Sequence, residues 1–141
     1  MYRSIIIPIN IGSIDFYEEI FTVAKTLSNS TMTNLHLIYV DENVNVFGHD
    51  YAYIPLRSET NNDLIASLDK FADKIDYPRD KIKTVVRNGS VLNEILKYSD
   101  IVEADLIIIG RGKPTWTSIF IGSLAVNLAQ ESKISVLIIP S

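Results

Sequence analysis

The sequence predicts an α/β protein in which helices cover both faces of a five-stranded parallel sheet, giving a three-layer sandwich. Five short apolar runs, rich in β-branched residues, are typical of strands buried on both faces. Segments with apolar residues at helical spacing separate these runs, so strands and helices alternate along the chain. Such alternation indicates parallel strands joined by crossover helices. We expect residues 1–141 to form one domain of this kind.

Each strand run is bounded by turn-forming residues or by a proline. The first run, SIIIPIN, is followed by Gly12, and the fourth, ADLIIIG, ends at Gly110. Because parallel strands end at the same edge of a sheet, a reversal of strand order opens a crevice there, and ligands usually bind in it. The expected strands are residues 4–10, 34–42, 81–87, 104–110 and 134–140.

The helices are predicted from apolar stripes and capping residues. Ser13 or Asp15 can cap the first helix, and Ser90 can cap the third. The fourth is expected from about Ser123 to Gln130, and residues 43–57 show no period and are expected to form a long loop. The first stripe consists of Phe16, Ile20, Val23, Ala24 and Leu27, and the second, which stops before Pro78, of Leu64, Leu68, Phe71, Ala72 and Ile75.

Composition excludes several classes of function. The net charge of -4 and the pI of about 5.1 argue against broad nucleic-acid binding, which needs a basic surface. The chain has no cysteine, which excludes disulfides and thiol catalysis and fits a cytoplasmic protein. No apolar run reaches the roughly 20 residues of a membrane span, so no membrane partner is expected. The charges of RDK (79–81) are expected to be solvated.

The stretch IIIGRGKPTWTSIFIGS, residues 107–123, is the main candidate for a functional site. Gly110, Gly112 and Gly122 would let a phosphate approach the main chain, and Ser123 adds a hydroxyl donor at an expected helix start. Arg111 or Lys113 adds positive charge. The alternative is an ordinary turn followed by a helix. Neither the P-loop string nor the dinucleotide fingerprint after the first strand is present.

The order of these segments resembles the universal stress protein family over essentially the whole chain. The family motif is G-x-x-G, nine residues, then G-[ST], and Gly112, nine residues and Gly122-Ser123 match its second half. SIIIPIN resembles the family's first strand, which ends Pro-x-Asp, and LHLIYVDE, RNGSVLNEIL and ISVLIIP resemble its other segments. GRGKPTWTSIFIGS is most similar to the subgroup that includes universal stress proteins F and G.

The resemblance implies an adenine nucleotide alpha hydrolase-like (Rossmann-like) fold that binds ATP or AMP, with or without Mg²⁺. Asn10 would lie near the ribose, and the main chain of Val40 would meet the adenine. It also implies a homodimer paired through the last strand, Val136 to Ile139. The full set of implied nucleotide contacts is Pro8, Ile9, Asn10, Val40, Gly110, Arg111, Gly112, Lys113, Gly122, Ser123 and Leu124.

Two departures from the family pattern bear on binding. The loop reads G-x-G instead of G-x-x-G, and Asn10 stands where the family has an aspartate. An amide keeps an acceptor for a ribose hydroxyl but loses the charge that strengthens that bond and attracts a metal. Weaker nucleotide binding is therefore expected.

The expected activity is a nucleotide-dependent switch or partner-binding role in the stress response. No general base is evident beside the proposed phosphates, so only slow ATP hydrolysis or autophosphorylation, at Ser123 or Thr117, is considered. The first alternative is a dimeric interaction module that binds no nucleotide, and the second is a nucleotide-using enzyme. His36 is expected to be structural, and no metal site is expected from His36 or His49.

Overall fold

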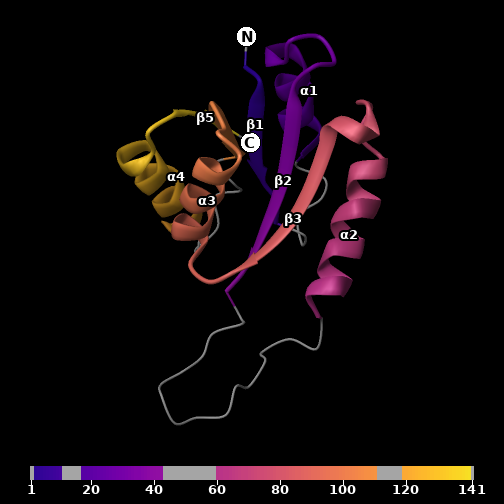
Figure 1. The fold of residues 1–141 in the computed structure, drawn as a ribbon. Coiled ribbons are helices and arrows are strands. Elements are labelled where there is room, and N and C mark those ends of the chain that lie inside the picture. Colours follow the sequence, from indigo (N-terminus) through magenta and orange to yellow (C-terminus); the bar gives the residue numbers. More distant parts are fainter. Residues whose placement is uncertain (1, 11–16, 43–59, 111–118, 141) are drawn as a thin grey trace.

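The computed structural model of the chain describes residues 2–10, 17–42, 60–110 and 119–140. These residues form an α/β structure whose elements alternate as expected (Figure 1). The strands are β1 (Ser4–Pro8), β2 (Asn34–Asp41), β3 (Ile82–Asn88), β4 (Leu106–Gly110) and β5 (Ser135–Ile139). The helices are α1 (Tyr17–Leu27), α2 (Asn61–Asp73), the 3₁₀ turn η2 (Arg79–Lys81), α3 (Val91–Ile101) and α4 (Ile119–Glu131).

The five strands form one parallel sheet in the order β3-β2-β1-β4-β5. The first strand of the chain is therefore the central strand, and Ile6 lies between His36 of β2 and Ile107 of β4. From β1 the chain adds β2 and β3 on one side, and then β4 and β5 on the other. The strand order thus reverses at β1, which is where ligands of open parallel sheets bind.

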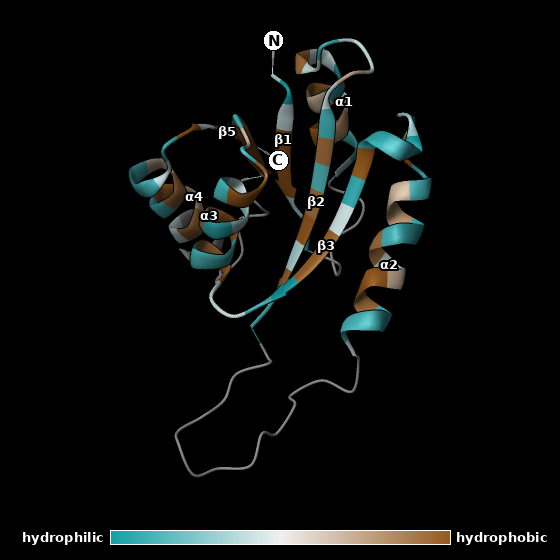
Figure 2. Ribbon diagram, viewed as in Figure 1, coloured by the Kyte–Doolittle hydropathy of each residue, from teal (hydrophilic) through white to brown (hydrophobic). Residues whose placement is uncertain are grey.

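Alternating isoleucines divide the interior into two hydrophobic cores, one on each face of the sheet. Ile5 and Ile7 face the core that α1 and α2 cover, whereas Ile6 faces the core that α3 and α4 cover. All three side chains are fully buried. Apolar residues run along the strands and the inner sides of the helices (Figure 2). The predicted three-layer sandwich is confirmed.

The helix starts differ from the expectations in part. Thr60, which was not expected to be a cap, precedes α2 and forms a capping box with Asp63. Thr60 Oγ1 accepts from Asp63 N at 3.2 Å, and Asp63 Oδ2 accepts from Thr60 N at 3.1 Å. Ser90 does precede α3, but its hydroxyl makes no capping bond. The expected caps Ser13 and Asp15 and the expected loop 43–57 lie outside the described residues.

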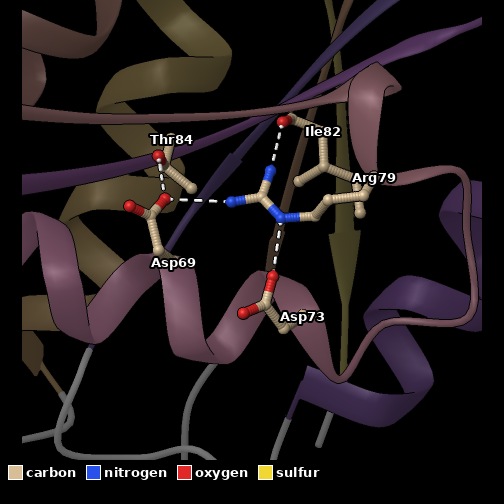
Figure 3. A network of polar contacts seen from close by, with 5 residues as sticks. All are labelled: Asp69, Asp73, Arg79, Ile82 and Thr84. Carbon is tan, nitrogen blue, oxygen red and sulfur yellow. Dashed lines mark hydrogen bonds and ion pairs between the residues drawn. The ribbon is translucent and has the colours of Figure 1, made fainter.

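A polar network joins α2 to η2 and β3 (Figure 3). Arg79 Nε donates to Asp73 at 2.8 Å, Nη2 donates to Asp69 at 3.0 Å, and Nη1 donates to the main-chain oxygen of Ile82 at 2.9 Å. Thr84 Oγ1 donates to the same Asp69 oxygen at 2.7 Å. Arg79 is exposed, as expected for RDK, but its guanidinium is also paired with two carboxylates of α2.

Candidate functional site

Several predicted contacts lie at the carboxyl edge of the sheet, where the strand order reverses. Pro8 ends β1 and is followed by Ile9 and Asn10, while Val40 lies near the end of β2 and Gly110 ends β4. Because β2, β1 and β4 are adjacent and parallel, these residues gather at one edge. The structure thus brings together the ribose and adenine half of the predicted site and the first glycine of the phosphate half.

The second part of the predicted phosphate site, Gly122 and Ser123, lies within helix α4 and not at its start. Helix α4 starts at Ile119, not near Ser123, so the expected start of this helix is wrong. Gly122 and Ser123 lie inside the helix, and the free N–H groups of its first turn belong to the residues before them. Ser123 is exposed, and the partly buried Leu124 packs against the core beneath α4.

Three predicted contacts lie outside the described residues. They belong to residues 111–118, between β4 and α4 in the chain, and Thr117, one of the two expected phosphate acceptors, also lies in this range. These three contacts are Arg111, Gly112 and Lys113.

The main chain at the end of β1 is held on two sides. Ile9 N–H donates to Ile38 O at 2.8 Å, which extends the pairing with β2 beyond the last residue of the strand. The next N–H, that of Asn10, donates to the phenolic oxygen of Tyr17 at 2.6 Å. Tyr17 begins α1, and the sequence offered no signal for this contact. Asn10 therefore projects from a main chain that both β2 and α1 restrain.

Tyr17 is itself fixed by aromatic packing. Its ring lies edge-on to Phe71 with centroids 5.7 Å apart, and 6.2 Å from the ring of Phe21. Burial raises the pKa of the Tyr17 hydroxyl, although the hydrogen bond from the Asn10 main chain acts in the opposite direction. The phenol is therefore neutral at physiological pH. The expected stripe of α1 begins with Phe16, which lies outside the described residues, whereas the buried residues of α1 begin with Tyr17.

A buried carboxylate that the sequence analysis missed lies at the same edge. Asp41, the last residue of β2, is 1% exposed, and its main-chain oxygen accepts from Gly89 N at 3.2 Å. Gly89 has φ +137°, a conformation that residues with a Cβ rarely adopt, and an added Cβ would lie 3.3 Å from Glu94 Oε2. Glycine in the predicted NGS turn is therefore required at this position.

Glu94 lies beside this turn and is paired with two cations. Arg87 Nε donates to Glu94 Oε1 at 3.0 Å, and Lys97 Nζ lies 3.5 Å from Oε2. The hydrogen bond from Arg87 is the main cause that lowers the pKa of Glu94. Since these groups satisfy one another, the cluster stabilises the junction of β3 and α3.

His36 is structural, as expected. It lies in the middle of β2, is 6% exposed, and its Nδ1 lies 2.9 Å from the hydroxyl of Tyr98. The described residues contain no group of three or more His, Cys, Asp or Glu side chains arranged to hold a metal ion. His49 lies outside the described residues. None of the helices in the described ranges has the length and apolar character needed to cross a membrane.

These features define the chain as a Rossmann-like α/β protein whose candidate ligand site lies where the strand order reverses. The sequence profile of the Universal stress protein family matches residues 1–140. The chain belongs to this family. Among curated relatives, it is 24% identical over 142 residues to Universal stress protein G of Salmonella typhimurium, and the match covers 99% of both chains.

Solved structures show the same fold. A universal stress protein in complex with cAMP superposes with a TM-score of 0.64 at 17% identity, covering 98% of this chain and 96% of the other. A family member from Arabidopsis thaliana with AMP bound superposes with a TM-score of 0.60 at 12% identity, covering 98% and 90%. At these identities the likeness establishes the arrangement of the chain.

Proposed function

We propose that the protein binds an adenine nucleotide, ATP or AMP, at the carboxyl edge of the sheet. The observation that carries the proposal is the reversal of strand order at β1, which gathers Asn10, Val40 and Gly110 at the ends of three adjacent strands. One solved relative holds cAMP and another holds AMP, which supports the choice of ligand class.

The ribose and the base would bind to the ends of β1 and β2. The amide oxygen of Asn10 accepts a hydrogen bond from a ribose hydroxyl, and the main chain of Val40 meets the adenine. Pro8 and Ile9, which precede Asn10 at the end of β1, would also contact the nucleotide. Because an amide bonds a hydroxyl more weakly than a carboxylate does, we expect lower affinity than an aspartate at position 10 would give.

The phosphates would lie along the glycine stretch that follows β4. Gly110, Gly112 and Gly122 allow close main-chain approach, and the hydroxyl of Ser123 donates to a phosphate oxygen. The remaining contacts proposed here are Arg111, Lys113 and Leu124.

Magnesium would bind mainly through the nucleotide. In phosphate sites Mg²⁺ keeps several waters and takes one or two carboxylates together with phosphate oxygens. Position 10 offers an amide instead of a carboxylate. We therefore expect Mg²⁺ to enter with the phosphates of ATP, and AMP to bind equally well without it.

The nucleotide would act as a switch in the cytoplasm during the stress response. A ligand shifts a conformational or partner equilibrium only by its difference in affinity for the two states, so occupancy would bias which partner binds. Turnover would be slow, with Ser123 or Thr117 as the acceptor in any autophosphorylation. Labelling with ATP above the level of heat-denatured protein is the expected sign of that reaction.

We further propose that two copies pair through β5. This strand forms one edge of the sheet, its residues Ser135–Ile139 include no charged side chain, and Ile138 is 39% exposed. The opposite edge, β3, carries Lys83 and Arg87. Charged side chains on an edge strand oppose pairing with another sheet, so β5 is the edge suited to a second copy.

The decisive experiment measures nucleotide binding directly. Freshly purified protein is denatured and the released nucleotide is chromatographed, and the stripped protein is titrated by calorimetry with ATP plus Mg²⁺ and with AMP. We expect released nucleotide or saturable binding, and loss of both in Gly122→Val, whose branched side chain would block the phosphates. Asn127→Val, at an exposed position of the same helix, should bind as the wild type does.

The alternative is a dimeric interaction module with no nucleotide site, and two features favour it: the amide at position 10 and the shortened G-x-G spacing. A ligand that binds only the folded state must raise its stability. A wild-type protein that shows no binding at millimolar nucleotide, together with an unchanged melting temperature, would contradict the nucleotide proposal and leave the interaction module.

A further inference from the structure

The end of β1 is held by a side chain as well as by the sheet. Ile9 N–H makes the last contact with β2, to Ile38 O at 2.8 Å. The next main-chain N–H, that of Asn10, points to α1 instead and donates to the Tyr17 hydroxyl at 2.6 Å. The Tyr17 hydroxyl therefore helps to hold the main chain of Asn10 in place.

That oxygen belongs to a rigid side chain. Tyr17 is 7% exposed, and its ring packs against Phe21 and Phe71, whose own rings lie 5.5 Å apart. Aromatic rings held in this way have few alternative rotamers, so the hydroxyl has a fixed place. Because burial keeps the phenol neutral, the contact does not change over the physiological pH range.

We propose that Tyr17 is a positioning residue of the nucleotide site, whose hydroxyl fixes the main chain of Asn10 and thereby aims the Asn10 amide at the ribose. The inference rests on the function proposed above. A displacement of about 1 Å in a binding group costs much of its hydrogen bond, because such bonds weaken steeply with distance and angle. The sequence alone assigns no role to Tyr17.

If Tyr17 only stabilised the fold, removing its hydroxyl should affect the site no more than removing that of another tyrosine bonded to the main chain. Tyr77 provides this control. Tyr77 also holds a main-chain group, since its hydroxyl donates to Thr33 O at 2.7 Å. Thr33 precedes β2, so this bond lies at the amino edge of the sheet, away from the proposed site. Tyr17→Phe and Tyr77→Phe each remove one hydroxyl from one tyrosine–main-chain contact.

The test compares the two variants in nucleotide affinity, measured by calorimetry with AMP and with ATP plus Mg²⁺. Tyr17→Phe should weaken the affinity about five- to tenfold, the effect of one lost hydrogen bond, and Tyr77→Phe should leave it unchanged. In the Asn10→Ala background, Tyr17→Phe should have no further effect on affinity, because the group that Tyr17 positions is gone.

A second readout needs no nucleotide. The amide proton of Asn10, followed by NMR, should exchange faster with solvent in Tyr17→Phe and at the wild-type rate in Tyr77→Phe. Unchanged exchange would overturn the positioning role, because it would show that the hydroxyl does not hold this amide.

The outcomes also separate this inference from the proposed function. Equal affinity in the wild type and Tyr17→Phe overturns the positioning role alone, and so does an undiminished effect of Tyr17→Phe in the Asn10→Ala background. A wild type that binds neither nucleotide overturns the proposed function, and the positioning role falls with it.

Discussion

Burial decides the charge of His36. The imidazole lies against Tyr98, with its Nδ1 at 2.9 Å from the hydroxyl and the rings in an edge-on arrangement. Its pKa is lowered from 6.5 to about 4, first because burial disfavours the charged form and second because the Lys83 ammonium repels it. The residue is therefore neutral at physiological pH and contributes to packing.

This pKa makes stability depend on pH. In the unfolded chain His36 titrates near 6.5, so between pH 6.5 and about 4 the unfolded state binds a proton that the folded state resists. The free energy of unfolding should therefore fall as the pH is lowered through that window, by up to about 3 kcal/mol. Urea unfolding at a series of pH values measures the fall.

Two variants isolate the contribution of His36 from that of the carboxylates. His36→Gln should lose this part of the pH dependence, and the only other histidine gives a matched variant, His49→Gln, which should retain it. Identical pH profiles for the two variants would show that the pKa of His36 is the same in the folded and the unfolded state, which would contradict the lowered value.

At the scale of elements, two helices that begin with similar residues are capped differently. Thr60 and Asp63 bond reciprocally at the start of α2, whereas Ser90 makes no side-chain capping bond at the start of α3. A cap stabilises a helix because its oxygen satisfies a main-chain N–H that has no partner within the helix. The residue type alone does not show whether that bond forms.

We expect the two capping positions to respond differently to alanine. Thr60→Ala should lower the free energy of unfolding by about 1 kcal/mol, because the Asp63 N–H loses its acceptor. Ser90→Ala should have little effect, since no capping bond is removed. Chemical denaturation of the two variants and the wild type measures these free energies, provided that all three have the same dependence on denaturant concentration. Equal losses of stability in the two variants would contradict the difference in capping.

The strands could be predicted because each is marked by its own run of apolar residues. The start of α4 could not be predicted from the residues around it. Consecutive isoleucines such as Ile5, Ile6 and Ile7 suit a strand buried on both faces, and both cores use them. Ahead of Ser123, the apolar residues 119–121 read equally well as strand or helix, and Gly122 suggested a boundary. The helix nevertheless runs through Gly122.

Side-chain contacts between neighbouring elements were beyond prediction for a different reason. The bonds of Arg79 to Asp73 and Asp69 exist only where η2 lies against α2. The bond from Asn10 to Tyr17 likewise depends on how α1 leaves β1. The sequence places Asn10 and Gly110 at the sheet edge by topology, but not the groups that orient them.

At the scale of the whole molecule, the two edges of the sheet differ in charge. We expect the uncharged edge to determine the oligomeric state. Ile138→Lys places a charge on β5 and should convert the proposed dimer to a monomer, as measured by light scattering after gel filtration. Val126→Lys, at a 54% exposed position of α4, is the matched control and should remain dimeric.

Either of two results would contradict pairing through β5. The first is a wild type that is monomeric at high concentration, and the second is an Ile138→Lys variant that keeps its dimer. If Val126→Lys also becomes monomeric, the interface includes the outer face of α4.

The central position of β1 also constrains the order in which the chain can fold. β1 precedes its neighbour β4 by about a hundred residues, since β4 begins only at Leu106. The Asp105 carboxylate, just before β4, accepts from the N–H groups of Arg3 and Ser4. Until that segment has been synthesised, one edge of β1 lacks its strand partner and Ile6 lacks the cover that α4 provides. We therefore expect a chain that lacks the residues from β4 onward to bind chaperones, and we expect completion of the sheet to limit the folding rate.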